Sequence, residues 1–192
     1  MQRLRGLDHR RADLDRRGLG GALTRIGVVS DTHLPRFGRA LPRALERGLR
    51  RAGVARILHL GDFTDLLAAD LFEAIAPFDA VAGNNDGDEI RARFGRRKIV
   101  SVEDVRIGMV HGDGRRGTTR SRALEAFAEE RVDVVLFGHS HRPVVGREGG
   151  LLIANPGSPT DKRLNPLYSY AILTVDGARA RVDLKFYASR AA

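Results

Sequence analysis

Five apolar stretches of the chain each end in a small residue next to acids, amides or imidazoles, and this pattern limits the fold more than any other feature. Apolar runs of this length between helical patterns are typical of buried strands in an α/β sheet. Ligand sites in such sheets form outside the carboxyl ends of the strands, so we expect the five strand exits to converge. The stretches are VVSDTH, LHLGD, VAGNND, GMVHGD and LFGHSH.

Helices and strands alternate over most of the chain, and hairpins follow near its end. Buried runs predict strands at 25–30, 55–62, 79–86 and 133–140, and leucine spacing predicts helices at 40–52, 64–76 and 121–132. Two further strands are expected in 98–113, a hairpin turning at Gly149 and Gly150 in 142–158, and two strands around an Asp-Gly turn in 168–187. This order favours a layered α/β protein with mixed sheets.

Length and composition suit one globular domain. The chain has 192 residues, of which 42% are hydrophobic, and we expect a single domain over residues 24–192. Residues 1–23 mix basic and acidic side chains and end in glycines, which predicts a flexible basic extension. No apolar run approaches the roughly 18 to 20 residues of a membrane span, the first 23 residues lack the apolar core of a secretion signal, and cysteine is absent. We therefore expect a cytoplasmic protein without a membrane partner.

The net charge of +9 raises the question of nucleic acid as a partner. However, the arginines are scattered, and aromatic residues make up only 6% of the chain, so no basic stripe carries stacking side chains. The charge is therefore interpreted as a solvated arginine-rich surface, and nucleic-acid binding stays an unsupported alternative.

The strand exits carry seven side chains that can bind metal. Imidazoles and carboxylates without thiolates suit Zn²⁺, Fe or Mn²⁺ better than calcium. Seven ligands exceed what one ion takes from a protein, whereas two ions about 3.5–4 Å apart that share a bridging carboxylate would use them all. We expect His59 to lie near the site without binding metal, and His9 to take no part. The predicted ligands are Asp31, His33, Asp62, Asn84, His111, His139 and His141.

The ordered motifs DTH, GD, GNxD, HG and GHSH, with NPGS at Asn155 to Ser158, resemble those of the calcineurin-like metallophosphoesterases. The chain is most similar to their small single-domain bacterial and archaeal phosphodiesterases over residues 25–187. The resemblance implies the metallophosphoesterase fold, an αββα sandwich of two mixed sheets flanked by helices. It also implies two divalent ions, with Mn²⁺ favoured and Zn²⁺, Fe or Ni²⁺ as alternatives. In that scheme Asp31, His33 and His141 hold one ion, Asn84, His111 and His139 hold the other, and Asp62 bridges both.

The expected activity is hydrolysis of a small phosphoester, with a diester favoured, by a hydroxide that bridges the two ions. The resemblance makes Asp62, Asn84, Asn85 and Asp86 the candidate catalytic group. Many relatives have a histidine where this chain has Asn85, and an amide cannot deliver a proton to the leaving group. Asn85 is alternatively a plain turn residue.

Three arginines are candidates for binding the substrate phosphate, with a solvated charged loop as the alternative reading. Arg115 and Arg116 follow the HGD motif, where Asp113 replaces a histidine common in relatives, and Arg163 follows the NPGS turn. Two other functions stay open: a weakly catalytic or non-catalytic scaffold on the same fold, as in a retromer subunit, and a nuclease. A homo-oligomer is also left open.

Overall fold

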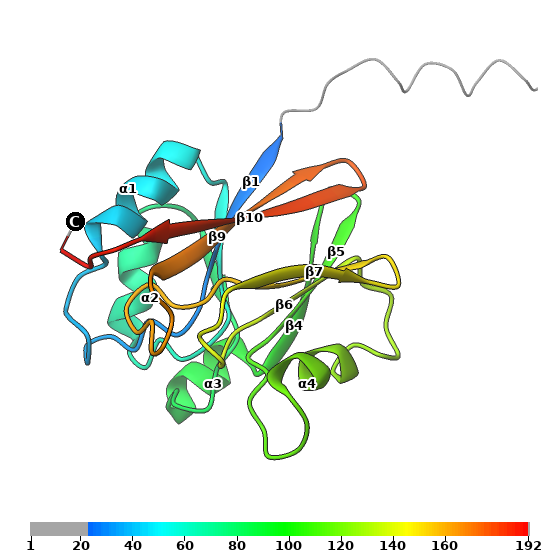
Figure 1. Cartoon of the computed structure of the whole chain (residues 1–192), viewed down its shortest axis with the longest axis horizontal. Helices are drawn as coiled ribbons and strands as arrows, with labels where there is room; N and C mark the ends of the chain where they lie inside the picture. Colours follow the sequence, from blue (N-terminus) through cyan, green and yellow to red (C-terminus); the bar gives the residue numbers. More distant parts are fainter. Residues whose placement is uncertain (1–22, 192) are drawn as a thin grey trace, which may run out of the picture.

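Two mixed sheets face each other at the centre of the molecule, with helices on their outer faces (Figure 1). The computed structural model describes residues 23–191. The predicted extension, apart from its last residue, lies outside the described residues, as does His9. The expected αββα sandwich of mixed sheets is confirmed.

The first sheet has the strand order β10-β9-β1-β2-β3. Its strands β1, β2 and β3 run parallel, whereas β9 runs antiparallel to both β1 and β10. The parallel strands therefore end at one common edge of the sheet. Their bounds are β1 Thr24–Val29, β2 Arg56–His59, β3 Phe78–Ala80, β9 Tyr168–Asp176 and β10 Arg179–Tyr187.

The second sheet has the strand order β4-β5-β6-β8-β7. Here β5, β6 and β8 are parallel neighbours, and β4 and β7 pair antiparallel at the two edges. The expected turns at Glu103–Asp104 and Gly149–Gly150 join β4 to β5 and β7 to β8. The bounds are β4 Arg97–Val102, β5 Val105–Val110, β6 Val134–Phe137, β7 Val144–Glu148 and β8 Leu151–Asn155.

Alternation along the strands divides the apolar side chains between three layers of core. In β1, Ile26 and Val28 point between the sheets, whereas Val29 points toward the helices on the other face. In β6, Leu136 likewise faces the inter-sheet core and Phe137 faces helix α4 (Thr119–Glu125). A strand with apolar residues on both faces can be covered on both faces, which is why the chain folds as four layers.

Helices α1 (Arg43–Ala52) and α2 (Leu66–Glu73) cover the outer face of the first sheet, and α4 covers the second (Figure 1). Helix α1 ends where predicted, at Gly53, whose φ of 61° suits a residue without a side chain. Helix α2 begins after Asp65, whose carboxylate accepts a hydrogen bond from the Leu67 N–H at 2.8 Å.

Two predictions about helices were wrong. Helix α3 (Asp88–Phe94) was missed because it has only seven residues, although its Ile90 and Phe94 have helical spacing. Helix α4 begins and ends earlier than the expected 121–132, since Thr118 caps it and Phe127 onward continues in turns bonded to the third preceding residue. The third predicted strand is also shorter, and ends at Ala80.

None of the helices between residues 23 and 191 has the length and apolar character that crossing a membrane requires.

A pair of identical substitutions tests the burial pattern. Leu45 is fully buried between α1 and the first sheet, and Leu67 on α2 is 45% exposed. We expect Leu45→Ala to lower the free energy of unfolding by about 2–5 kcal/mol through lost contacts and a residual cavity. Leu67→Ala should change it by less than about 1 kcal/mol. Urea unfolding of both variants measures the difference, and equal losses would contradict this packing.

Candidate metal centre

Seven polar side chains follow the carboxyl ends of strands from both sheets. Two strands of the second sheet and three of the first contribute them, and the two sheets bring these ends to the same side of the inter-sheet core. The residues after β1 are Asp31 and His33, after β2 Asp62, after β3 Asn84, after β5 His111, and after β6 His139 and His141. Six of them form two clusters of metal-binding character, and the seventh, Asn84, is exposed.

The first cluster consists of Asp31, His33 and His141, whose ligand atoms all lie within 4.8 Å of one another. The His33 and His141 Nε2 atoms are 3.4 Å apart, and Asp31 Oδ1 is 3.2 Å from His141 Nε2 and 4.0 Å from His33 Nε2. Ligands about 2.0–2.1 Å from a tetrahedral Zn²⁺ lie about 3.3 Å from each other. The spacing therefore fits one shared cation.

The second cluster consists of Asp62, His111 and His139, under the same 4.8 Å limit. His111 Nε2 is 3.2 Å from Asp62 Oδ2. The imidazole rings of His111 and His139 lie edge to face, with their centroids 5.1 Å apart. The same Asp62 oxygen is 3.9 Å from His33 Nε2 in the first cluster. Asp62 thus stands between the two clusters.

Unpaired buried atoms test whether these residues fit a cation. Among residues 23–191, Asp31 Oδ1 and His111 Nε2 are buried without a hydrogen-bond partner, and the third such atom belongs to the Arg91 guanidinium. Burying an unpartnered polar atom is costly, and both atoms belong to the clusters. A divalent cation would satisfy both, and the donor set of imidazoles and carboxylates suits Zn²⁺, Fe or Mn²⁺.

Hydrogen bonds on the far side of two imidazoles set which nitrogen faces the clusters. His111 Nδ1 lies 2.7 Å from the Leu60 carbonyl oxygen, and His141 Nδ1 lies 2.6 Å from the Asp161 carbonyl oxygen. A carbonyl oxygen only accepts, so each Nδ1 carries a proton, and in the neutral imidazole each Nε2 would present its lone pair to the cluster. This is the tautomer that binds a metal ion.

The buried aspartates and histidines of the clusters shift one another's pKa values. Burial raises the pKa of Asp31 and Asp62, but the neighbouring histidines and hydrogen bonds outweigh burial and leave both pKa values below the ordinary range. Burial lowers the pKa of His111, yet Asp62 and Asp31 raise it to about 9. Burial lowers the pKa of His33 and His139, which favours neutral imidazoles.

Five of the clustered residues have backbone φ angles in the left-handed region. The values are 57° at Asp31, 45° at His33, 59° at Asp62, 63° at His139 and 56° at His141. Such conformations cost residues with a side chain of order 1 kcal/mol each and gather at functional sites. Two backbone bonds hold the loops after β1 and β2 together, from Asp31 N to Gly61 O at 3.0 Å and from His33 N to Asp62 O at 2.9 Å.

The loop after β3 holds Asp62 rather than offering a proton donor. Asn85 donates its backbone N–H to Asp62 Oδ1 at 2.8 Å and its side-chain amide to Asp62 Oδ2 at 2.6 Å. Gly83 packs so closely that a Cβ there would lie 2.2 Å from Asp62 Oδ1. The amide of Asn85 thus fixes the orientation of the carboxylate between the clusters.

Asp86 is buried and ties two loops to each other. Its carboxylate accepts backbone N–H bonds from Asp62 at 2.7 Å, Thr64 at 2.6 Å and Gly83 at 2.7 Å. All three donors are amides of the loops after β2 and β3, so the side chain acts on their conformation. The Asn84 side chain is exposed and makes no hydrogen bond within residues 23–191.

Side chains of the NPGS turn form hydrogen bonds with the loops that carry candidate ligands. The Asn155 amide donates to the Gly138 carbonyl at 2.7 Å and to Ser140 Oγ at 3.1 Å, within the loop that carries His139 and His141. Ser158 Oγ donates to the Asp31 carbonyl at 2.8 Å. One turn therefore positions loops from both sheets.

The three predicted substrate arginines separate in the structure. Arg163 lines a cavity of about 370 Å³ beside the first cluster. Arg115 and Arg116 are exposed on the loop before α4 and are not among the residues that line this cavity. Sequence reasoning missed Arg36, although it follows His33 by only three residues. The cavity is lined by His33, Arg36, Thr64, Asn85, Asp161 and Arg163.

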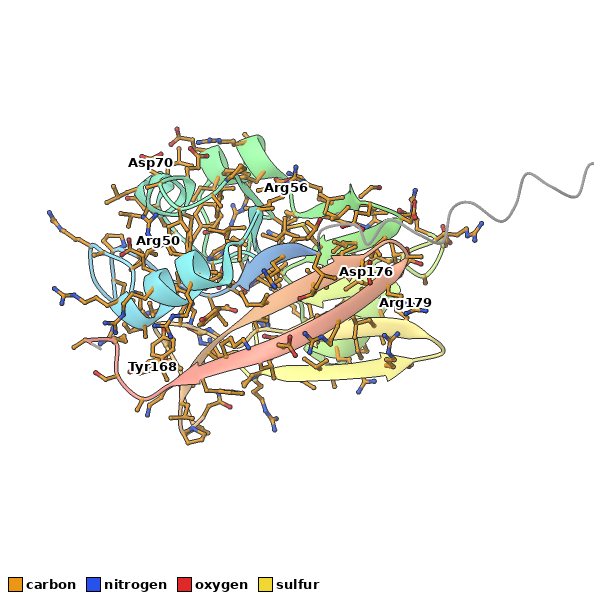
Figure 2. All side chains as sticks on the ribbon, turned by 90° about the horizontal axis from the view of Figure 1, so that it is seen from above. Arg50, Arg56, Asp70, Tyr168, Asp176 and Arg179 are labelled. Carbon is orange, nitrogen blue, oxygen red and sulfur yellow. The ribbon has the colours of Figure 1, made fainter. Side chains whose placement is uncertain are left out.

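A larger hollow of about 950 Å³ lies between the β7–β8 hairpin and β10. Arg179, which lines it, stands at the turn that joins β9 to β10 (Figure 2). None of the candidate ligands lines this hollow, so its size does not make it the reactive site.

The comparisons with known proteins agree with this site. The model of the calcineurin-like phosphoesterase superfamily domain matches residues 24–178. A probable metallophosphoesterase of Methanothermobacter thermautotrophicus is 34% identical over 161 residues, which cover 83% of this chain and 90% of that protein. A phosphodiesterase of Methanocaldococcus jannaschii is 29% identical over 148 residues, which cover 69% and 82%. Vps29 from Chaetomium thermophilum has the same fold, with a TM-score of 0.70 and 21% identity over 85% of this chain and 97% of that one.

The chain therefore belongs to the calcineurin-like phosphoesterase superfamily. By family it is a metallophosphoesterase, and it presents two clusters of candidate metal ligands.

His59 lies in β2 outside both clusters. Its Nδ1 accepts the Gly61 N–H at 3.2 Å, and its Nε2 is 3.2 Å from Thr32 Oγ1. Burial disfavours the charged imidazolium and lowers the pKa of His59 to about 3. In the unfolded chain the pKa is about 6.5.

This difference makes a testable contribution to the pH dependence of stability. Between about pH 3 and pH 6.5 the unfolded chain binds a proton at His59 that the folded chain does not, so the free energy of unfolding rises with pH there. The contribution is complete above pH 6.5 and is lost as the pH falls toward 3. We expect His59→Gln to reduce the slope by about 1.4 kcal/mol per pH unit. Urea unfolding of both metal-free proteins between pH 4.5 and 6.5 measures this, and parallel slopes would refute it.

Proposed function

We propose that the protein is a metal-dependent phosphodiesterase that hydrolyses small phosphoesters with a hydroxide generated between two divalent cations. The observation that carries the proposal is the position of Asp62 Oδ2, 3.2 Å from His111 Nε2 and 3.9 Å from His33 Nε2, between two clusters of candidate ligands. The M. jannaschii relative named a phosphodiesterase supports the choice of diesters.

The proposed ligands divide between the two cations. Asp31, His33 and His141 would hold the first, His111, His139 and Asn84 the second, and Asp62 both. When bound, two such cations lower the pKa of a water enough to provide hydroxide near neutral pH and neutralise charge on the phosphoryl oxygens. Mn²⁺ is the proposed ion, with Zn²⁺, Fe or Ni²⁺ as alternatives for the same nitrogen and oxygen donors.

The protein itself contributes orientation. The backbone carbonyls of Leu60 and Asp161 accept hydrogen bonds from Nδ1 of His111 and His141, which turns Nε2 of each ring toward the clusters. Asn85 holds both oxygens of Asp62, and Asp86 holds the backbone of the same loops. In this proposal Asn85 and Asp86 act as positioning residues.

Removal of Asp62 tests the proposal most directly. We expect Asp62→Ala to lower kcat/KM for bis(p-nitrophenyl) phosphate in Mn²⁺ by at least about 100-fold, since the carboxylate shared by both ions is lost. Chelation of the wild type should abolish turnover. Asp70→Asn is the matched control, because Asp70 is an exposed carboxylate on α2 (Figure 2) and should leave both unchanged.

Metal analysis makes the outcome decisive. The wild type should bind about two ions per chain and Asp62→Ala fewer, as measured by plasma mass spectrometry after dialysis. Turnover that survives chelation or Asp62→Ala would overturn the mechanism. A protein that binds two ions and hydrolyses no monoester, diester, nucleotide or nucleic acid would favour the alternative of a scaffold. Preference for a polynucleotide would favour a nuclease.

The nature of residue 85 predicts the leaving-group preference. The Asn85 amide is engaged with Asp62 and cannot transfer a proton at neutral pH. General acid catalysis contributes about 10²–10⁴-fold, so we expect aryl diesters to be hydrolysed faster than alkyl diesters by at least about 100-fold.

Two variants of Asn85 separate protonation from positioning. Asn85→His should raise kcat for thymidine 5′-methyl phosphate relative to thymidine 5′-(p-nitrophenyl phosphate) by about tenfold or more, because it adds a titratable donor. Asn85→Ala removes the contact to Asp62 without adding an acid and should lower both rates alike. An unchanged ratio in Asn85→His would contradict the assignment.

A further inference from the structure

The cavity beside the first cluster carries two arginines on its walls, Arg36 and Arg163, together with His33. We propose that these arginines form a subsite for a second phosphate of the substrate, so that the preferred substrates are diesters bearing an additional terminal phosphate. The inference rests on the proposed function, because the metal clusters fix where the scissile phosphoryl group lies.

Arg36 has no carboxylate partner within residues 23–191. Its guanidinium carbon lies 5.3 Å from the centroid of the Phe37 ring, and Arg190 stacks on the same ring at 5.5 Å. Some other arginines of the described chain are paired with acids, for example Arg91 with Asp88 and Arg96 with Asp113. An unpaired cation on the wall of a cavity next to a phosphoryl site is available to an anion.

Arg163 is only weakly neutralised. Its Nε is 3.9 Å from Asp161 Oδ2, and its side chain is 52% exposed. Asp161 is the only acid among residues 23–191 that lines this cavity, and it has other contacts. Its Oδ1 accepts the Arg163 backbone N–H at 3.3 Å, and its Oδ2 lies 3.6 Å from His141 Nδ1. The walls of the cavity therefore keep an excess of positive charge.

Both arginines sit on turns that are tied to ligands of the first cluster. The turn around Arg36 is closed by Phe37 N to the His33 carbonyl at 3.3 Å and by Gly38 N to the Pro35 carbonyl at 3.0 Å. The turn around Arg163 is closed by Asn165, whose amide also donates to the His141 carbonyl at 2.8 Å. The backbone that carries each arginine is thus tied to the cluster, which limits the part of the ordering cost that the turns contribute.

A phosphate monoester is the group that fits this subsite best. Two guanidinium groups match the charge of a phosphate dianion, and their planar arrays of N–H donors match its oxygens. The volume of about 370 Å³ lies at the lower end of the range for small-molecule sites, so it suits a compact group rather than a polymer. Asn85 and Thr64 also line the cavity and are uncharged.

Two matched esters test the subsite. Thymidine 5′-(p-nitrophenyl phosphate) is compared with the same ester carrying a 3′-phosphate, and both release p-nitrophenolate from an identical reacting group. We expect kcat/KM to be at least about tenfold higher for the 3′-phosphate ester, a typical size for charge-assisted hydrogen bonds. Arg36→Gln and Arg163→Gln should each reduce this ratio, and the double variant should bring it close to one. Arg47→Gln, an exposed arginine of α1 away from the cavity, should leave the ratio unchanged.

Binding separates failure of the subsite from failure of the enzyme. If neither ester is hydrolysed, the proposed function fails, and calorimetry on the Mn²⁺-loaded protein then tests the subsite alone. Thymidine 3′,5′-bisphosphate should bind at least about tenfold more tightly than thymidine 5′-monophosphate, and the double variant should lose the difference. Equal kcat/KM values for the two esters, equal binding of the two nucleotides, or a preference that survives the double variant would overturn the inference.

Discussion

The carboxylate of Asp62 is the interaction on which the rest of the site depends. It receives two N–H bonds from Asn85 on one side, and on the other it faces His111 at 3.2 Å and His33 at 3.9 Å. These groups come from loops after β1, β2, β3 and β5, which belong to both sheets. Polar contacts of this one side chain therefore join loops of the two sheets, in addition to the apolar contacts between the sheets.

Burying so many polar groups together costs free energy unless each of them has a hydrogen-bond partner or a bound ion. Asp31 Oδ1 and His111 Nε2 are buried without partners, and five of the clustered residues have left-handed backbones. Residues in these states persist only where the surroundings force them. Here hydrogen bonds from Asp86 and from the NPGS turn fix the conformation of the loops. Divalent cations would supply the missing partners of the unpaired atoms.

The strands were predictable because their apolar residues form short runs or alternate, and most of these segments end in a recognisable turn or polar exit. The hairpin turns at Gly149–Gly150 and beside Gly177 were predictable because their positive φ angles favour glycine. Helix α3 was missed because seven residues with two apolar anchors give a weak periodic signal. Helix α4 was misplaced because the leucine and phenylalanine spacing continues past Glu125, whereas the hydrogen bonds there change to a tighter turn.

The sequence by itself determined the class of fold and the chemistry of the candidate ligands, because strand exits and residue types are local properties of the chain. Tertiary structure alone decided which polar residues work together. It placed the Asn85 amide on Asp62, gave Asp86 three backbone donors, and put Arg36 on the cavity wall while Arg115 stayed outside it. These relations join residues far apart in the chain through the paths of loops, and loop paths follow from packing that no local pattern encodes.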